Sequence, residues 1–502
     1  MKSAVDVQEP FDAALPGSAA RGREGNRLLL LSEHFYPTEA TCGRLLTALS
    51  EDLVAQGLEV SVLTSFSVHS ASRSKSRRET YRGVDICRVR SLRLPRSRVL
   101  CRLLNEMSLT LTIFLNALLR PGLERIMVTS SPPFLAPAAA LVAAIRRVPL
   151  IYLVMDVYPD IAAVTGHLER GSLLYRTWDA VCRFALKRST RVVVLGECMR
   201  NVIRAKTAGE EVAIEVVPNW ADGEEIFPIA DDENRFFASH PGLEGRFLVQ
   251  YSGNFGLFHD FETIIDAAEA LKDREEIHFL IIGKGARKRW IEEQIAGRGL
   301  NNVTLLPYMP RSELNFSLNA QSVSLVTLER GTEGLSVPSK FYPLLAAGKP
   351  VIAVMNQAAE VARVVENEGV GVVVEQQDVE GLVAAIERLS ESPRLCALMG
   401  QRAREVQQRR FDRRHAVRRY MRLIRSVSPA DRSVSPADRS VSAADRSVSP
   451  AGRSVSPADR SVSPADRFLL PAERSLLPAD RSLSGPETGR LRPTGHLRPE
   501  RG

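Results

Sequence analysis

Short apolar runs, many of them rich in Val, Ile and Leu, alternate with longer amphipathic stretches between residues 27 and 425. Parallel strands that helices cover on both faces produce this pattern, because neither face of such a sheet meets water. The chain is therefore predicted to have an α/β fold with two series of strands. The first series comprises residues 27–32, 59–64, 86–89, 125–129, 150–154, 191–195 and 214–217, and the second comprises residues 247–252, 277–283, 303–306, 323–328, 350–354 and 371–374.

A polar stretch rich in Asn, Asp, Gly and Pro separates the two series and has no periodicity, as expected of an interdomain linker. We therefore predict two Rossmann-like domains at residues 26–220 and 246–402, a linker at residues 221–245 and a basic helix at residues 403–425. Residues 1–25 contain acids and prolines where a signal peptide needs an uninterrupted apolar core. They are interpreted as a disordered leader.

The last part of the chain, residues 426–502, repeats the seven-residue unit RSVSPAD. A period of seven suggests a coiled coil, but nearly every copy has proline at the same place, which removes a helical hydrogen bond and clashes with the preceding turn. Each copy also has too little apolar surface to offset the entropy of the chain. We predict a disordered tail, whose regularity the expansion of a short DNA repeat explains, although its Ser-Pro steps would also suit phosphorylation or a partner.

The six cysteines are scattered, with no Cys-x-x-Cys pair and no Cys/His cluster at zinc spacing. This distribution predicts reduced thiols in a cytoplasmic protein and no metal site. The proportions of hydrophobic and charged residues, 44% and 25%, are those of a soluble globular protein.

The net charge of +8 is unevenly placed, since eleven Lys and Arg residues lie between positions 73 and 102. An apolar stretch follows at residues 99–119, but three polar residues interrupt it, so it is not expected to span a membrane. Segment 73–119 is interpreted as a contact with the surface of an anionic membrane, although a solvated face is the alternative. A second basic run at residues 402–425 suits a solvated face or a helix that covers the core with arginine stems. No nucleic-acid-binding motif accompanies this charge, and nucleic acid is not an expected partner.

Candidate site residues in the first half follow two strands. The loop after the first strand leads into a helix, where open α/β sheets bind ligands, so His34, Gly43 and Arg44 are expected to border the cleft. His34 could equally be a structural histidine. Asp156 ends the fifth strand and opens onto the same crevice, where its carboxylate could stabilise developing positive charge. Asp160 is interpreted as a cap of the next helix.

The second half begins with two turns in which a strand, glycines and a helix follow one another. Gly253 and Asn254 belong to the first turn, and Gly283 and Gly285 to the second. Glycines let backbone amides approach a diphosphate closely, and two such turns in one domain are a stronger signal than one. Asp260 is interpreted as the cap of the helix after the first turn.

The segment ERGTEGLSVPSKFYPLLAAGKPVIA places a polar loop before a short helix. The amides around Gly334 and the helix start, the hydroxyl of Ser339 and the ammonium of Lys340 together suit a diphosphate. The alternative, with Ser339 as a helix cap and Lys340 as a surface charge, requires a coincidence of charge and place. We favour the anion site.

Seven segments, in order, resemble the retaining GT-B glycosyltransferases of family 4, especially fucosamine-type transferases of bacterial surface-polysaccharide synthesis. They are FYPTEATCGRLLTALSEDLVAQGLEVSVLTS, DVYPD, VVVLGECM, VVPNW, YSGN, LIIGKGA and GLSVPSKFYPLLAAGKPVIA. This resemblance spans residues 27–425. It implies two sheets that face a cleft, an acceptor in the first domain, a nucleotide sugar in the second, and last helices that return to the first domain.

The resemblance also implies roles for individual residues. Transfer with retention, by front-side departure and attack, needs charge against the leaving diphosphate, for which Lys340 and Ser339 are the candidates, with no metal ion or other cofactor. Asp156 would act on the sugar side. Relatives carry two glutamates eight positions apart. Counting back from the Ala-Ala-Gly motif places Leu335 at the first position, whereas the other count starts from Glu333, which would substitute for one glutamate. The second position holds Pro343 or Phe341, depending on the motif used for counting, and the arginine and lysine common after the first glycine turn are represented by Asn254 and His259.

The predicted function is transfer of a sugar from a nucleotide diphosphate, for which UDP is the commonest choice in the family, to a lipid-linked or glycan acceptor. The resemblance places this reaction at the cytoplasmic face of the cell membrane, in exopolysaccharide, capsule or lipopolysaccharide synthesis. Two alternatives stay open. The first is a sugar-nucleotide epimerase on the same architecture, and the second is an inactive binding scaffold, which the incomplete glutamate pair suggests.

Overall fold

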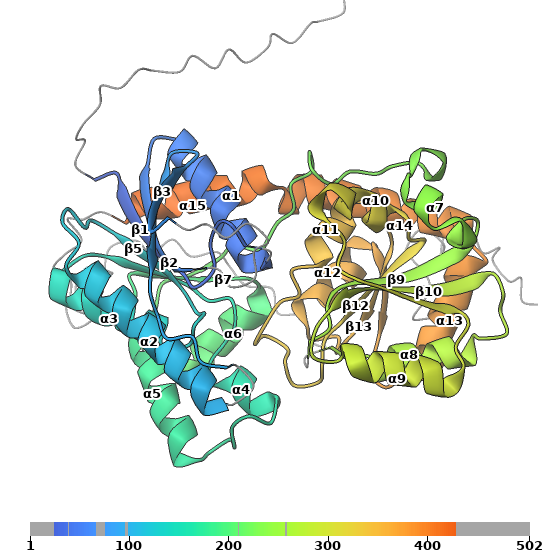
Figure 1. Cartoon of the computed structure of the whole chain (residues 1–502), viewed down its shortest axis with the longest axis horizontal. Coiled ribbons are helices and arrows are strands. Elements are labelled where there is room, and N and C mark those ends of the chain that lie inside the picture. Colours follow the sequence, from blue (N-terminus) through green and yellow to red (C-terminus); the bar gives the residue numbers. More distant parts are fainter. Residues whose placement is uncertain are drawn as a thin grey trace, which may run out of the picture. The chain divides into compact units, whose positions relative to one another are not determined.

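The computed structural model describes residues 25–38, 40–66, 76–95, 99–208, 210–256 and 259–427 (Figure 1). The predicted leader, apart from Gly25, lies outside the described residues, and so does the repeat tail after Val427.

The first domain contains an eight-stranded sheet in the order β3-β4-β2-β1-β5-β6-β7-β8, in which only β3 is antiparallel to its neighbour. Its strands are β1 (Arg27–Leu31), β2 (Glu59–Ser65), β3 (Arg78–Tyr81), β4 (Val84–Val89), β5 (Ile126–Thr129), β6 (Leu150–Leu153), β7 (Arg191–Val194) and β8 (Ile214–Val216). Its helices are α1 (Thr41–Ala55), α2 (Val99–Leu118), α3 (Leu135–Arg146), α4 (Asp160–Val164), α5 (Leu173–Arg188) and α6 (Glu197–Lys206).

The direction of each connection decides which face a helix covers. The connection from β1 to β2 runs towards β3, whereas the connections from β4 onwards run towards β8. Because such crossovers are right-handed, α1 covers one face of the sheet, and α2, α3 and α5 cover the other (Figure 1). The carboxyl ends of the parallel strands meet at one edge, where ligands are expected.

The second domain contains a six-stranded parallel sheet in the order β11-β10-β9-β12-β13-β14. Its strands are β9 (Phe247–Asn254), β10 (Ile277–Lys284), β11 (Val303–Leu306), β12 (Val323–Thr327), β13 (Val351–Val354) and β14 (Gly371–Val374). Its helices are α8 (Glu262–Ala270), α9 (Lys288–Arg298), α10 (Leu314–Asn319), α11 (Phe341–Ala346), α12 (Glu360–Glu368), α13 (Val379–Ser390) and α14 (Pro393–Val406).

The predicted fold class, two parallel α/β sheets of Rossmann type, is confirmed, and every strand of both predicted series is present. Strand β3 was not predicted, because its residues Arg-Glu-Thr-Tyr are polar and only partly covered. Arg82 and Gly83, with φ of 46° and 79°, join β3 to β4. Two consecutive left-handed residues suit a tight hairpin, so Gly83 was the available signal.

The segment expected as a linker, residues 221–245, contains three short helical turns rather than open loop alone. They are η1 (Asp231–Glu233), α7 (Phe236–Ser239) and η2 (Pro241–Leu243). Phe236, Phe237 and Leu243 are buried in a cluster with residues of β9 and β10. The later half of this segment therefore packs on the second domain.

The chain ends its described part with a bent pair of helices. After α14, a π-helical turn (Gln407–Phe411) leads to Asp412, which is extended and caps α15 (Arg413–Ser426) by accepting a hydrogen bond from the Arg414 amide at 3.0 Å. The amide of Ala221 donates to the carbonyl of Phe411 at 3.0 Å, and the amide of Arg413 to that of Ala221 at 3.1 Å. The outgoing and returning crossings between the domains thus run side by side.

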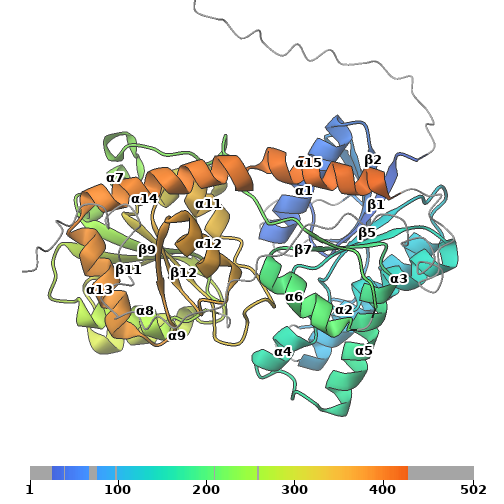
Figure 2. The same cartoon turned by 180° about the vertical axis from the view of Figure 1, so that it is seen from behind.

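Helix α15 lies against α1 of the first domain (Figure 2). The Arg413 guanidinium donates to both oxygens of Asp52 at 2.7 and 3.0 Å and to Asp222 at 3.0 Å. Tyr420 packs edge-to-face on Trp220 at 6.1 Å. These contacts hold the returning helix on the first domain.

Replacing Arg413 by Met is expected to lower the free energy of unfolding by about 2 kcal/mol, because Asp52 and Asp222 lose a partly buried partner while the apolar stem is retained. Denaturant unfolding followed by tryptophan fluorescence measures this change. The matched control is Arg409→Met, since the Arg409 side chain is 65% exposed and its pair with Glu368 should contribute less than about 1 kcal/mol. Equal losses in both variants would show that the docking of α15 does not depend on Arg413.

Candidate functional site

The polar loop between β12 and α11 meets the carboxyl end of β6. Asp156 and Ser336 form an antiparallel backbone bridge, and the amide of Val157 donates to the carbonyl of Leu335 at 2.9 Å. The structure therefore brings Asp156 together with the loop that carries Glu333, Gly334, Ser339 and Lys340. The two predicted halves of the site come from different domains.

Asp156 is half-buried at this junction. Its amide donates to Ser130 Oγ at 3.0 Å, which fixes the end of β6 against the end of β5. Burial raises the pKa of the Asp156 carboxyl, and a hydrogen bond with Ser336 acts in the opposite direction. A carboxyl in this state can accept from a hydroxyl group or retain a proton.

Lys340 is not a solvated surface charge. Its Nζ lies 3.7 Å from the centre of the Tyr251 ring and donates to the Tyr251 hydroxyl, which in turn donates to the carbonyl of Asn254 at 2.8 Å. Within the described residues no carboxylate pairs with this ammonium, and burial holds the pKa of Lys340 well below its usual range. An anion that entered beside Lys340 would supply the missing negative charge.

Ser339 does not cap the following helix. Helix α11 is only six residues long, its cap residue is Lys340, and no side chain accepts a capping hydrogen bond there. Ser339 is half-buried on the approach to Lys340. The alternative interpretation of Ser339 as a helix cap is therefore wrong, while its contact with a diphosphate stays a prediction.

The glycines of the two turns lie where β9 and β10 end in register, with Gly253 opposite Gly283. A Cβ on Gly283 would lie 1.9 Å from the Gly253 carbonyl oxygen, and one on Gly285 would lie 2.4 Å from that of Phe255. The close approach of the two chain segments is enough to require glycine at positions 283 and 285, without any contact to a ligand. Gly253 differs, because a Cβ at this position would lie 3.2 Å from Lys340 Nζ.

His259 also belongs to this cluster. It lies edge-to-face with Tyr251 at 5.9 Å, and its Nδ1 pairs with the Thr327 carbonyl at 3.1 Å. Burial, and next the charge of Lys340, lower the pKa of His259 from 6.5 to about 3. The imidazole is therefore neutral at physiological pH and does not replace the cation that relatives carry in this region. Asn254 is exposed at the end of β9.

Glu333 has a carboxylate oxygen, Oε1, that is shielded from solvent and accepts no hydrogen bond from the described residues. A shielded acceptor without a partner suits a hydroxyl group of a ligand. The neighbouring Gly334 has a φ of 73°, and a Cβ there would lie 3.0 Å from the Cys198 carbonyl oxygen in α6. Neither Phe341, which is buried, nor Pro343 supplies a second carboxylate.

On the side of the first domain, His34, Gly43 and Arg44 surround the start of α1. His34 Nε2 lies 3.9 Å from Glu33, and a Cβ on Gly43 would lie 3.1 Å from His34, so Gly43 allows the loop to pack on the helix. Burial, with the charges of Asp156 and Glu33, raises the pKa of Cys42 to about 12. Cys42 therefore links this loop to the surroundings of Asp156.

Arg44 has an interdomain partner. Its guanidinium lies 3.8 Å from Glu225, which also accepts from Arg311 of the second domain at 2.7 and 2.8 Å. The two arginines share one carboxylate, and burial lowers the pKa of Arg44. Arg44 thus contributes to the junction of the domains.

Two further residues of the region were not predicted. Tyr251 supports Lys340 through its ring and its hydroxyl. Glu360, the first residue of α12, accepts from the amide of Cys198 at the start of α6 at 3.2 Å. A carboxylate at a helix start is favourable, and this one joins the second domain to the first. Neither role had a local sequence signal, because each depends on a partner far along the chain.

The interpretation of Asp160 as a helix cap is wrong. Asp160 is the first residue of α4 and makes no capping bond. It accepts instead from the Tyr175 hydroxyl at 2.9 Å and from Lys206 Nζ at 2.5 Å, and Lys206 also donates to Asp179. This network joins α4, α5 and α6.

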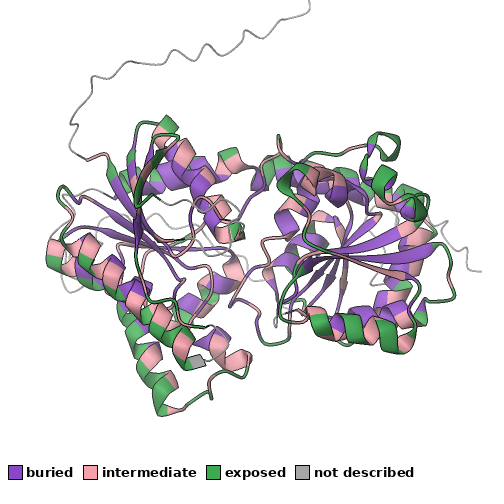
Figure 3. Cartoon of the chain, in the orientation of Figure 1, coloured by how far each residue is buried: buried purple, intermediate pink, exposed green. Residues whose placement is uncertain are grey.

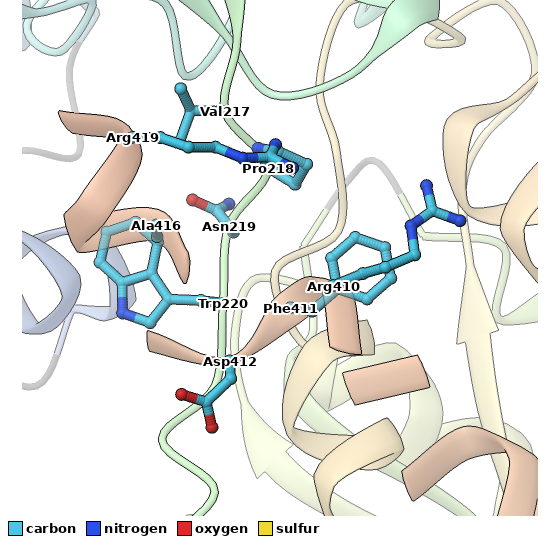
Figure 4. Close-up of a pocket in the computed structure, with 9 residues that line it drawn as sticks. All are labelled: Val217, Pro218, Asn219, Trp220, Arg410, Phe411, Asp412, Ala416 and Arg419. Carbon is cyan, nitrogen blue, oxygen red and sulfur yellow. The ribbon is translucent and has the colours of Figure 1, made fainter. Parts of the chain in front are cut away.

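A small hollow lies away from this cluster, where the two crossings run side by side (Figure 4). Trp220, Phe411 and Asp412 are among the residues that line it. In the part of the chain that the structure describes, no group of three or more His, Cys, Asp and Glu side chains is arranged to hold a metal ion.

Two family models match the chain. Residues 41–220 match the glycosyl transferase 4-like domain, and residues 232–406 match the glycosyl transferases group 1 family. Together they cover every strand of the two sheets except β1, and the loop from Glu333 to Lys340.

Individual proteins are also similar to the chain. The probable glycosyltransferase WbjE of Pseudomonas aeruginosa is 32% identical over 48% of this chain and 60% of its own length. The putative colanic acid biosynthesis glycosyl transferase WcaI of Escherichia coli is 27% identical over 80% of this chain and 100% of its own length. Among solved structures, HepE of Anabaena in complex with UDP-glucose superimposes with a TM-score of 0.61 at 15% identity, covering 80% of this chain and 99% of HepE.

Replacing His259 by Asn, whose amide can still donate to Thr327, is expected to make stability less dependent on pH. The folded chain holds the imidazole neutral down to about pH 3, whereas the unfolded chain takes up a proton near pH 6.5, so stability present above pH 6.5 is lost as the pH falls. Between about pH 7 and about pH 4.5, the wild type should lose roughly 2 to 3 kcal/mol more than the variant. Denaturant midpoints at the two pH values measure this difference, and identical losses would contradict a neutral buried His259.

Proposed function

We propose that this chain, which belongs to the group 1 glycosyltransferases of the GT-B fold and carries a glycosyl transferase 4-like domain, transfers a sugar from a nucleotide diphosphate to a lipid-linked or glycan acceptor with retention. The observation that carries the proposal is the buried ammonium of Lys340. It lacks a carboxylate partner among the described residues and lies at the loop that meets Asp156.

The donor diphosphate binds beside Lys340 and Gly253. A negative diphosphate restores the charged state of the lysine, so the attraction grows as charge develops on the leaving group. The Ser339 hydroxyl and the amides around Gly334 add donors on the same side. UDP is the proposed nucleotide, which the UDP-glucose complex of HepE supports as an analogy of fold. The leaving diphosphate is neutralised by these groups without a metal ion.

The sugar of the donor then lies between Glu333 of the second domain and Asp156 of the first. Glu333 Oε1 accepts from a sugar hydroxyl, and Asp156 faces the anomeric carbon from the first domain, where a carboxylate stabilises positive charge. The acceptor hydroxyl approaches from the loop that holds His34, on the same face as the leaving diphosphate. Front-side attack gives retention.

The names of WbjE and WcaI support a place in bacterial surface-polysaccharide synthesis, as exopolysaccharide, capsule or lipopolysaccharide. Such syntheses build on lipid carriers, so the enzyme would work as a peripheral protein at the cytoplasmic face of the membrane, with segment 73–119 in contact with lipid.

Donor turnover tests the proposal. UDP-, GDP- and TDP-sugars are incubated with and without polyprenyl-diphosphate sugars, and nucleotide release is followed. Lys340→Met should lower acceptor-dependent release by about 10²- to 10³-fold, because one charged donor to the leaving group is lost. Lys288→Met is the matched control, since Lys288 is 45% exposed on α9 and should leave the rate unchanged. Proton NMR of the product shows whether the anomeric configuration is retained, and release that EDTA abolishes would contradict metal independence.

Other outcomes favour the two alternatives. Conversion of a nucleotide sugar without any acceptor would indicate an epimerase. Binding without hydrolysis, conversion or transfer of any donor would indicate a scaffold, for which the missing second glutamate is the motivating observation.

Nucleotide binding can be tested apart from turnover. Without ligand, Lys340→Met should be more stable than the wild type by about 1 kcal/mol at neutral pH, because burial of the Lys340 amine without a counter-charge costs free energy whether the amine stays charged or gives up its proton. Saturating UDP at about 100 times its dissociation constant should stabilise the wild type by roughly 2.7 kcal/mol and the variant by much less. Thermal unfolding with and without UDP measures both effects. Equal stabilisation of the two proteins by UDP would place the diphosphate away from Lys340.

A further inference from the structure

The helices α2, α3 and α5 have many exposed residues on their outer sides (Figure 3). An unusual number of these residues are large and apolar. Seventeen such side chains are exposed among the described residues, and twelve of them lie on these three helices: six on α2, two on α3 and four on α5. They are Leu100, Leu103, Leu104, Met107, Leu111, Leu115, Leu141, Ile145, Leu173, Leu174, Val181 and Phe184. Because α2 packs on α3 and α3 on α5, on one side of the first sheet, we call this surface the three-helix face.

Helix α2 is apolar on two opposite sides. Leu109, Ile113 and Ala117 are buried against the domain. On the opposite side, Leu111 and Leu115 are 58% and 46% exposed. A second apolar side on a surface helix normally marks a contact with a partner or a membrane, and on α2 that side is exposed.

Helix α3 shows the same property over a shorter length. Its sequence, LAPAAALVAAIR, contains no polar residue before Arg146, and Leu141 and Ile145 are exposed one turn apart. Helix α5 differs, because exposed Val181 and Phe184 alternate with exposed arginines. The apolar surface thus passes from α2 across α3 to a mixed border on α5.

The three-helix face has an excess of positive charge. The three helices contain six basic residues, which are Arg102, Arg146, Arg176, Arg183, Lys187 and Arg188. Their two acidic residues, Glu106 and Asp179, are mostly covered, with 22% and 12% of their side chains exposed, and both take part in ion pairs. Apolar side chains bordered by an excess of basic residues match the surface of an anionic bilayer, where leucines enter the acyl boundary and arginines meet lipid phosphates.

We propose that the three-helix face binds the surface of an anionic lipid bilayer, with the exposed leucines of α2 and α3 inserted below the headgroups and the arginines of α5 on lipid phosphates. In the described part of the chain no helix is both long and apolar enough to cross a membrane. In this proposal the three helices lie on the membrane surface. This surface extends beyond segment 73–119, because α3 and α5 also contribute to it. The sequence had not predicted a membrane contact for these two helices.

The three-helix face leads to the proposed site. Phe134, at the start of α3, stacks on Trp178 of α5 at 5.2 Å, and Trp178 stacks on Tyr158 at 5.8 Å. Tyr158 is two residues from Asp156, and burial, with the charges of Asp156 and of Glu106 on α2, raises the pKa of its hydroxyl. A lipid-linked acceptor held in the bilayer would therefore reach Asp156 past aromatic rings. Only this delivery role rests on the proposed function, and the binding of lipid does not.

Vesicle flotation with the full chain tests the proposal. Vesicles of phosphatidylcholine alone are compared with vesicles that also contain phosphatidylglycerol, without donor or acceptor. We expect binding to the mixed vesicles that weakens as salt rises, and much weaker binding to the neutral ones. Leu111→Glu/Leu115→Glu should weaken binding by roughly a hundredfold or more, because charged groups replace two inserted side chains.

The matched control is Leu398→Glu, on α14, where the leucine is 38% exposed outside the three-helix face. It should bind vesicles like the wild type. Loss of binding in this control, unchanged binding in the double variant, or no binding of the wild type would each overturn the proposal. Self-association in solution that the double variant abolishes, without vesicle binding, would assign the face to a second copy of the chain.

Turnover of a water-soluble acceptor separates this inference from the proposed function. The double variant should keep this turnover and its thermal stability while losing lipid binding. Vesicle binding by a chain that turns over no donor would refute the proposed function and leave the membrane surface standing.

Discussion

The candidate site depends on a short backbone pairing between the two domains. The bridge between Asp156 and Ser336, with the hydrogen bond from Val157 to Leu335, joins the end of β6 to the loop that leads to Lys340. Backbone hydrogen bonds fix the register of the two loops whatever their side chains are. The pairing thereby holds Asp156 of one domain beside the loop of the other domain that leads to Lys340, an arrangement that neither sheet could provide alone.

Among the described residues, the ionisable groups near this pairing lack partners of opposite charge that would fully offset their burial. Burial lowers the pKa of Lys340 and raises that of Asp156, and His259 remains neutral beside the lysine. Groups in this condition reduce the stability of the free protein, and a ligand of the right charge removes that cost. Fixed groups of this kind also need little rearrangement when charge develops in a reaction.

The parts that the sequence predicted correctly are those with local causes. Buried β-branched runs identified the strands, and the order of loop, serine, lysine and helix identified the segment around Lys340. The exposed strand β3 and the buried Phe236 and Phe237 of the expected linker were missed, because their partners lie elsewhere in the chain. The same reason explains Tyr251 and Glu360, whose roles arise only when distant loops meet.

Helix α15 completes the first domain although it comes after the second domain in the chain. Its Tyr420 packs on Trp220, and Arg125 donates to the carbonyl of Val427 at 2.6 Å. During synthesis, the side of the first sheet that carries α1 therefore waits for a helix made about two hundred residues later than β8. The first domain leaves the ribosome first but is completed last, when α15 packs on it. The second domain can therefore fold before the first domain is complete.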